Sequence, residues 1–419
     1  MEGSNKLVER KFLLPFILIT TLFALWGFAN DITNPMVAAF QSILKLPAAK
    51  AAWIQAAFYG GYFTMALPAA LFIRRYSYKS GILLGLTLYA VGAFLFIPAA
   101  ALQSFVFFCI SLYILTFGLA FLETTANPFI LSLGSKENAT RRLNLAQAFN
   151  PMGSLMGMAV AAWVVLPNLV SNTPGAVLTE ADVTSDIHVI RNAYVALGCV
   201  VTFILIVIAL VKMPKTQGDK EGLSLSRTFN NLWTNKPYRE GVLTQMFYVG
   251  AQIMTWTFII QYAGNLGIDK ATAQKFNIIA MGSFLTFRFV ATFLMKYVNS
   301  RKLLAIFGTG AALCTLGAIC FVGMHGVICL ICVSAFMSLM FPTIYGISLE
   351  NVSAEDSTIG AAFLVMAIVG GSFMPLLQGK IIDLGTVANH PAVNVSFVLP
   401  LFCFLVVTLY GLRRAKELK

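Results

Sequence analysis

The chain consists almost entirely of long apolar runs separated by short polar connections. A run of about 20 apolar residues crosses the hydrocarbon core of a bilayer as a helix, because that core is about 30 Å thick and a helix rises about 1.5 Å per residue. We expect such spans near residues 12–44, 50–73, 80–101, 104–134, 142–166, 191–212, 240–265, 270–297, 301–323, 326–351, 357–384 and 391–413. Within each run the apolar residues are continuous and do not alternate with polar ones, which favours helices over the strands of a membrane barrel. The sequence therefore predicts an all-α membrane protein with twelve transmembrane helices.

Composition excludes most other classes of protein. Of the 419 residues, 58% are hydrophobic and only 11% are charged, whereas a soluble domain carries about 25% charged residues. The net charge of +12 arises mainly from Lys and Arg in the short connections, where they set membrane topology, so we expect no nucleic-acid partner. The seven cysteines lie inside apolar runs, which argues against a disulfide framework. We expect a monomeric transporter in a lipid bilayer, not an enzyme, with a small-molecule substrate and no metal or cofactor.

The basic residues also predict the topology. If the N-terminus lies in the cytoplasm, most of the 29 Lys and Arg residues fall in cytoplasmic connections or at the termini, as the positive-inside rule requires. We therefore expect an integral membrane protein, in a bacterial inner membrane, with both termini in the cytoplasm. The basic stretch 213–239 is then a cytoplasmic linker that divides the chain into an N-terminal half, residues 1–212, and a C-terminal half, residues 240–419, each with six helices.

The two halves resemble each other weakly. In each half a proline, Pro128 or Pro342, lies near the end of one span, and a polar turn and a glycine-containing segment follow it. Duplicated halves are typical of secondary transporters, which hold their substrate near the middle of the membrane and expose it to each side in turn. The sequence thus predicts two pseudo-symmetric six-helix halves around a central cavity.

Two carboxyl groups lie inside predicted spans. Asp31 lies near the middle of the first span, with Asn34 one turn further along the same helix face, and Pro35 frees a backbone carbonyl nearby. Glu123 lies near the middle of the fourth span, with no basic residue within a helical turn. An ionisable group at this depth costs several kcal/mol, and desolvation favours the neutral form of Glu123. We interpret Glu123 and Asp31 as the residues that couple transport to a proton or another cation; a structural hydrogen bond or a packing contact is the alternative for each.

Amide and aromatic side chains recur in the spans and suit a carbohydrate. Asn144 and Gln147 are three residues apart and share a helix face, and an amide offers both donors and acceptors to sugar hydroxyls. Each such residue could instead bond a neighbouring helix or lie in an interfacial belt. Arg288, inside the eighth span, could extend to the membrane surface or pair with a carboxyl of a gate. The candidate sugar-binding residues are Gln147, Asn144, Asn34, Gln55, Tyr59, Asn127, Gln252 and Trp256.

Several strings of residues resemble the fucose permease branch of the major facilitator superfamily. They occur in order along nearly the whole chain and include Leu25-Trp26-Gly27-Phe28-Ala29-Asn30-Asp31, Leu122-Glu123-Thr124-Thr125-Ala126-Asn127-Pro128-Phe129 and Arg142-Leu143-Asn144-Leu145-Ala146-Gln147. The resemblance implies the twelve-helix fold of this superfamily and cation-coupled uptake of fucose, galactose, glucose or a related hexose. It places the essential glutamate on Glu123 and the sugar-contacting glutamine on Gln147. In the first span the acid and the amide exchange places relative to the family pattern, so the Asp31 carboxyl lies one turn away on the same face.

These observations favour a secondary active sugar transporter that takes up a hexose or 6-deoxyhexose with protons by alternating access. A sodium-coupled sugar symporter is the alternative, since relatives in this branch use either cation. A non-sugar exporter of the same fold would have a more apolar cavity than these amides provide. A sugar sensor would normally carry an added signalling domain.

Overall fold

The protein is helical over most of its length. The computed structural model describes residues 7–44, 53–172, 178–213, 225–268, 270–321, 323–387 and 390–417, with the side chains of residues 33–42, 55–56, 172 and 270–271 outside the description. Within these ranges one antiparallel pair of short strands occurs, β1 (Thr386–Val387) and β2 (His390–Pro391).

The chain forms two compact units. We call Arg10–Phe129 together with Phe149–Glu221 the N-terminal unit. We call Met1–Glu9, Ile130–Ala148 and Gly222–Lys419 together the C-terminal unit.

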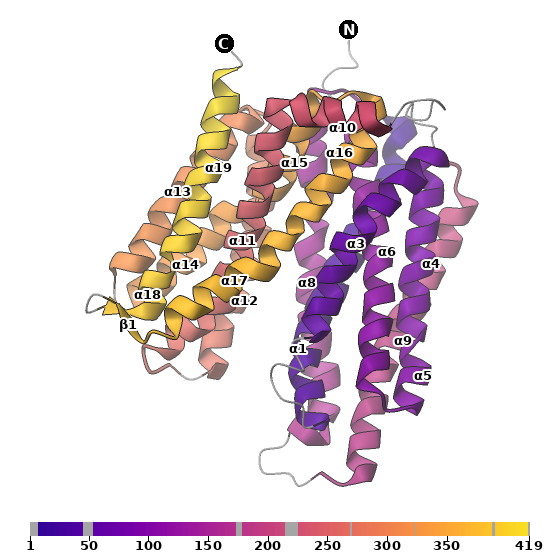
Figure 1. The fold of residues 1–419 in the computed structure, drawn as a ribbon, viewed down its shortest axis with the longest axis vertical. Coiled ribbons are helices and arrows are strands. Elements are labelled where there is room, and N and C mark those ends of the chain that lie inside the picture. Colours follow the sequence, from indigo (N-terminus) through magenta and orange to yellow (C-terminus); the bar gives the residue numbers. More distant parts are fainter. Residues whose placement is uncertain are drawn as a thin grey trace. The chain divides into compact units, whose positions relative to one another are not determined.

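The N-terminal unit is a bundle of long helices (Figure 1). Glycines allow α1 and α8 to approach closely, because a Cβ atom on Gly153 would lie 1.8 Å from the Ala24 carbonyl oxygen and one on Gly27 would lie 1.9 Å from that of Asn150. This packing fixes the helix that carries Asp31. The elements are η1 (Arg10–Phe12), α1 (Leu13–Ile43), α3 (Trp53–Arg75), α4 (Tyr78–Phe94), α5 (Phe96–Ala101), α6 (Phe105–Ser132, whose last residues belong to the other unit), α8 (Phe149–Val160), η2 (Ala161–Val165), η3 (Leu166–Asn168), η4 (Val170–Asn172) and α9 (Glu180–Leu210).

The C-terminal unit packs around α11. This helix contacts α12, α14, α15, α17 and α19, and α13 packs against both α14 and α19. The short helix α7 belongs to this unit and packs against α12 and α15. The elements are α7 (Ala139–Gln147), α10 (Leu225–Thr234), α11 (Lys236–Gly264), α12 (Lys270–Leu294), α13 (Ser300–Cys320), α14 (Met324–Met337), α15 (Met340–Glu350), α16 (Ala354–Met366), η5 (Ala367–Val369), α17 (Gly370–Ile382), α18 (Ala392–Ser396) and α19 (Val398–Lys416).

The helices agree with the predicted membrane spans. Ten helical segments of the described chain are long and apolar enough to cross a membrane, and α3 and α11, with 23 and 29 residues, occupy the second and seventh predicted spans. Large apolar side chains point outward from the bundles: Trp163, Phe203 and Leu210 are 80%, 67% and 81% exposed. Apolar side chains that point outward from helices of membrane-spanning length face lipid, and together with the ten apolar spans they show that the chain is an integral membrane protein.

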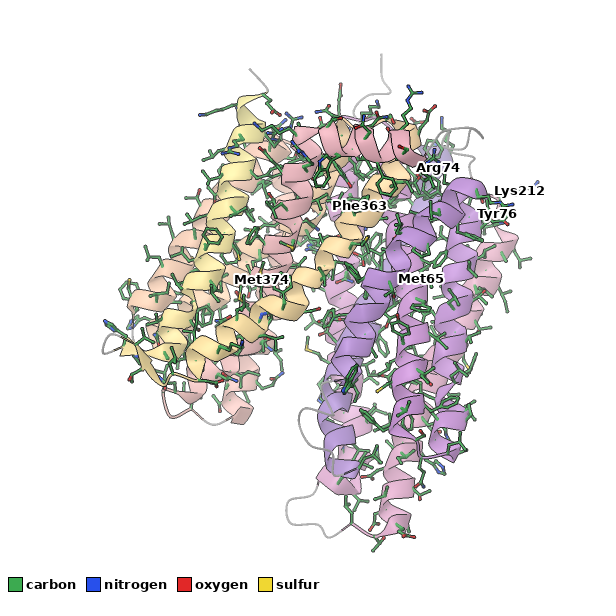
Figure 2. The ribbon with its side chains drawn as sticks, viewed as in Figure 1. Met65, Arg74, Tyr76, Lys212, Phe363 and Met374 are labelled. Carbon is green, nitrogen blue, oxygen red and sulfur yellow. The ribbon has the colours of Figure 1, made fainter. Side chains whose placement is uncertain are left out.

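Basic residues lie at one end of the helices of the N-terminal unit. Figure 2 shows Arg74, Tyr76 and Lys212 at this end. Lys79 donates to the carbonyl oxygens of Ala209 and Val211, each at 2.8 Å, and so satisfies acceptors that the end of α9 leaves without helical partners.

Candidate substrate and coupling site

The first coupling candidate, Asp31, lies buried in α1 of the N-terminal unit. The neighbouring Asn30 donates from Nδ2 to Asp31 Oδ2 at 3.5 Å. Tyr59 of α3 is half-buried and lies within electrostatic range of the Asp31 carboxylate. The structure therefore places two of the sequence-predicted residues, Asp31 and Tyr59, within electrostatic range of each other, and Asn30 gives the carboxylate a polar neighbour.

The second coupling candidate, Glu123, lies in α6 of the same unit. Its side chain is half-buried, whereas Asn127, one turn further along the helix, is fully buried. The carboxylate lies within electrostatic range of Tyr62 of α3, and the Trp26 indole lies close to the same tyrosine hydroxyl. Among the described residues Glu123 forms no ion pair. A carboxyl group in this setting can take up and release a proton without breaking a salt bridge.

The amide candidates of the fifth predicted span lie on α7 in the C-terminal unit. Asn144 is fully buried and donates from Nδ2 to the Thr140 carbonyl oxygen at 2.9 Å and to Thr343 Oγ1 of α15 at 3.1 Å. Its Oδ1 has no hydrogen-bond partner among the described residues. Gln147 is also buried, and the helix ends at this residue. One face of α7 thus presents two amides, of which Asn144 also bonds a neighbouring helix.

Arg288 of α12 binds two backbone carbonyls that prolines leave without helical donors. Proline has no N–H group, so the carbonyl four residues earlier lacks its helical partner. Pro151 leaves the Gln147 carbonyl in this state, and Pro342 leaves the Ser338 carbonyl. Arg288 donates from Nη1 to the Gln147 oxygen at 2.9 Å and from Nε to the Ser338 oxygen.

These carbonyls lie at two breaks within predicted spans. α7 ends at Gln147 and α8 begins at Phe149, while α14 ends at Met337 and α15 begins at Met340. Ala148, Ser338 and Leu339, which lie at these breaks, keep right-handed helical backbone angles, so what is missing is the helical hydrogen bond to each carbonyl. A carbonyl without a donor at membrane depth needs another protein group to bind it. Two roles were expected for Arg288, pairing with a carboxyl or extension to the membrane surface. Among the described residues it has no carboxyl partner, and its guanidinium is buried and binds the carbonyls at both breaks.

Arg142, in the first half of α7, also binds backbone carbonyls. Arg142 is fully buried and donates from Nε to the Ile130 carbonyl oxygen at 2.8 Å and from Nη2 to that of Leu131 at 2.7 Å. These are among the last carbonyls of α6, which have no partner within the helix. The Arg142 side chain thus links α7 to the end of α6, and the Gln147 carbonyl links α7 to α12 through Arg288.

The aromatic candidate Trp256 lies in α11 next to the Arg288 cluster. Its Nε1 donates to Ser334 Oγ at 3.2 Å, and its ring meets Phe284 edge-on with centroids 5.1 Å apart. The Arg288 guanidinium lies 4.5 Å from the centroid of the same Phe284 ring. Gln252, one turn before Trp256 on α11, is half-buried. The C-terminal unit therefore gathers an aromatic face and a fixed cation around Phe284.

The predicted residues fall into two groups, each inside one unit. Asp31, Tyr59, Glu123 and Asn127 lie in the N-terminal unit, and Asn144, Gln147, Gln252 and Trp256 lie in the C-terminal unit. The side chains of Asn34 and Gln55 lie outside the described residues.

Three further polar groups lie outside the list of candidate sugar-binding residues. The Thr124 hydroxyl, the Gln245 amide and the Ser372 hydroxyl are buried without hydrogen-bond partners in the described chain. A buried polar atom without a partner costs about 1–3 kcal/mol, so these groups are candidates to bind substrate or water. An apolar groove of about 770 Å³ lies between α1, α8 and α9 and is lined in part by Phe28, Met156 and Val189. None of the described candidate residues lines this groove.

Several known proteins are similar to this chain in sequence and in fold. The sequence model of the Major Facilitator Superfamily matches residues 17–375. The chain is 57% identical over 426 residues to the L-fucose-proton symporter of Haemophilus influenzae, with 99% of each chain covered. It is 29% identical to the glucose/galactose transporter of Brucella abortus, over 95% of this chain and 93% of that one.

A crystal structure of the transporter FucP in the outward conformation matches the fold with a TM-score of 0.88 at 32% identity, over 97% of this chain and 99% of that one. Ten apolar spans, two further membrane-length helices, and similarity over nearly the full length to transporters of one superfamily lead to a single assignment. The chain belongs to the major facilitator superfamily.

Proposed function

We propose that the protein is a proton-coupled sugar symporter that takes up L-fucose or a closely related hexose by alternating access. The observation that carries the proposal is the similarity over 99% of both chains to a protein named as an L-fucose-proton symporter. Glu123 adds a chemical reason, because it is a carboxyl inside an apolar span with no ion pair among the described residues.

Each candidate residue has a role in this proposal. Glu123 carries the proton, and Asp31, with its polar neighbours, contacts the sugar or the cation as well as contributing to coupling. The sugar hydroxyls bind amides, and the sugar ring lies against aromatic faces. The proposed sugar-binding residues are Gln147, Asn144, Asn34, Gln55, Tyr59, Asn127, Gln252 and Trp256.

Energy for uptake comes from the proton gradient and the membrane potential. Moving one charge through 100 mV supplies about 2.3 kcal/mol, which sustains a concentration ratio of about fifty. We propose that the protein works as a monomer in the bacterial inner membrane, with both termini in the cytoplasm. In this arrangement residues 1–212 and 240–419 are the two moving halves, and residues 213–239 join them.

The substrate is tested by counterflow in liposomes that contain the purified protein. Labelled L-fucose should exchange against internal L-fucose, and a panel of unlabelled hexoses should compete in the order of their affinity. Stronger competition by D-glucose and D-galactose than by L-fucose would instead favour the second candidate, a glucose/galactose transporter like the Brucella abortus relative. Exchange of none of these sugars would overturn the sugar assignment.

A further inference from the structure

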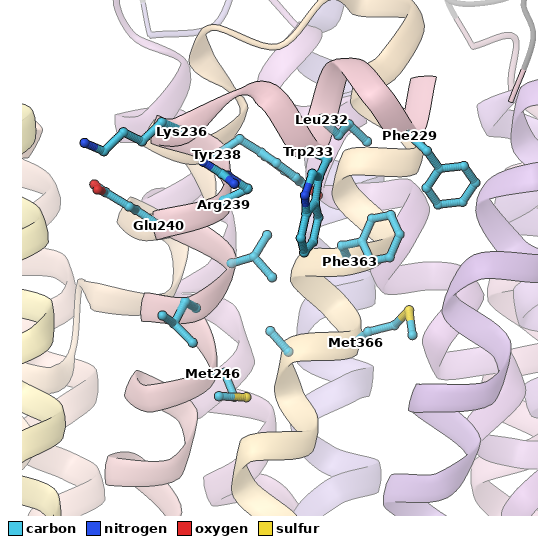
Figure 3. Close-up of a pocket in the computed structure, with 13 residues that line it drawn as sticks. Phe229, Leu232, Trp233, Lys236, Tyr238, Arg239, Glu240, Met246, Phe363 and Met366 are labelled. Atoms are coloured by element: carbon cyan, nitrogen blue, oxygen red, sulfur yellow. The ribbon is translucent and has the colours of Figure 1, made fainter. Parts of the chain in front are cut away.

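A cavity of about 610 Å³ lies in the C-terminal unit, and none of the described candidate sugar-binding residues lines it. Its walls come from α10, the first turns of α11, and α16 with the start of η5 (Figure 3). Phe229, Trp233 and Phe363 lie on one side of the cavity, and Lys236 and Arg239 lie on the other. The volume falls within the range of about 300–1,000 Å³ that small-molecule sites occupy.

Helix α10 presents an apolar stripe outward. Leu225, Phe229 and Trp233 follow one another at intervals of four residues and so share one helix face; they are 43%, 39% and 72% exposed. Thr228 and Leu232 are buried against the unit. A short helix that is apolar on its outer face and lies beside membrane-spanning helices belongs in the interfacial plane of the bilayer, and tryptophan is enriched there.

Positive charge lies at the rim of the same cavity. Lys236 and Arg239 are exposed, and neither forms an ion pair among the described residues. The Arg239 guanidinium lies 5.8 Å from the centroid of the Trp233 ring. The nearby carboxylate of Glu240 already accepts from Arg413 at 3.2 Å and from Arg414 at 2.9 Å, so it does not neutralise the rim.

We propose that this cavity binds an anionic phospholipid from the leaflet next to α10. The phosphate lies at Lys236 and Arg239, and one acyl chain lies against the apolar wall that Trp233 and Phe363 form. A lipid provides the negative charge and the apolar chain in one molecule, which matches the two sides of the cavity. Basic residues near a membrane surface attract anionic lipid in this way.

The test measures quenching of Trp233 fluorescence by lipids with brominated acyl chains, using the full-length protein in liposomes. The Trp233→Phe protein supplies the background from the other four tryptophans. Brominated phosphatidylglycerol should quench Trp233 at lower mole fractions than brominated phosphatidylcholine. Lys236→Ala with Arg239→Ala should weaken phosphatidylglycerol binding about thirtyfold, and each single variant about fivefold, since each basic residue near the surface contributes about 1 kcal/mol.

The matched control is Lys302→Ala with Lys416→Ala. These residues are exposed and lie outside the cavity, and the pair changes the net charge by the same amount. The control should keep the preference for phosphatidylglycerol. Equal quenching by the two lipids in the unaltered protein overturns the proposal. So does an unchanged preference in the Lys236→Ala, Arg239→Ala protein, or an equal loss of preference in the control.

Discussion

Arg288 should contribute more to the stability of the C-terminal unit than any exposed arginine. The Arg288→Ala substitution removes two charged hydrogen bonds, to the Gln147 and Ser338 carbonyl oxygens. A hydrogen bond to a charged group contributes about 1.5–3 kcal/mol, so the expected loss is about 3–6 kcal/mol, with the lower end applying if water enters the space. The loss should appear as a lower midpoint of thermal unfolding in detergent and as weaker sugar binding, since Gln147 is a proposed sugar residue.

The matched control is Arg141→Ala. Arg141 also joins α7 to α12, by a bond from Nε to the Thr292 carbonyl oxygen at 3.1 Å, but that carbonyl does not precede a proline by four residues. This substitution removes one charged hydrogen bond from a half-buried side chain, so it should cost about 1.5 kcal/mol, the lower end of the range for such a bond.

A second substitution tests the reason for the loss. Ser338 and Leu339 both keep right-handed helical backbone angles, with φ of −53° and −93°, so an N–H group at position 342 would point back toward the Ser338 carbonyl. Pro342→Ala supplies this group and should recover part of the stability of the Arg288→Ala protein. The two changes should therefore be non-additive. Additive effects, or an Arg288→Ala loss no larger than that of Arg141→Ala, would refute the reasoning.

Three further predictions follow from the packing, the amides and the charge pattern. Gln147→Ala should weaken sugar binding roughly 5- to 150-fold in an equilibrium binding assay, because a sugar hydroxyl without its partner costs about 1–3 kcal/mol; unchanged binding would remove Gln147 from the site. Gly153→Ala should lower the thermal midpoint by an overpacking cost of about 1–3 kcal/mol, since the new Cβ would lie 1.8 Å from the Ala24 carbonyl oxygen, whereas Gly282→Ala has no atom within 4 Å of the new Cβ and should be neutral or stabilising. A cysteine at Ser226 should react with an impermeant reagent in inside-out vesicles only, because residues 213–239 are predicted to be cytoplasmic; labelling in intact cells would reverse the topology.

Much of the fold could be predicted from the apolar runs, because length and hydrophobicity decide whether a helix crosses a bilayer. How the two helix breaks within these apolar runs are satisfied could not be predicted from the sequence. Pro151 and Pro342 indicate where a carbonyl loses its donor, but the donor that replaces them, Arg288, is 141 residues from Gln147 along the chain. Only the tertiary structure brings a guanidinium to both carbonyls.

The candidate site was predictable to a similar extent. The cost of a carboxyl at membrane depth singles out Asp31 and Glu123 without any structure. Helical spacing correctly places Asn144 and Gln147 on one face of α7, but it cannot say what this face meets. The structure shows that Asn144 meets Thr343, a contact between residues 199 positions apart. The Thr124 hydroxyl becomes a candidate to bind substrate or water only once the structure shows that it is buried without a hydrogen-bond partner among the described residues.

The most direct test of the proposed function is L-fucose accumulation by purified protein in liposomes with an imposed pH gradient, alkaline inside, compared with a sodium gradient at equal pH. We predict accumulation under the pH gradient alone. The Glu123→Gln protein, which mimics the protonated acid, should lose this accumulation but keep L-fucose counterflow, because the loaded carrier can still reorient. Asp31→Asn should weaken sugar affinity as well as coupling. Accumulation driven by sodium with no response to the pH gradient would contradict proton coupling, and full accumulation by the Glu123→Gln protein would contradict the role of Glu123.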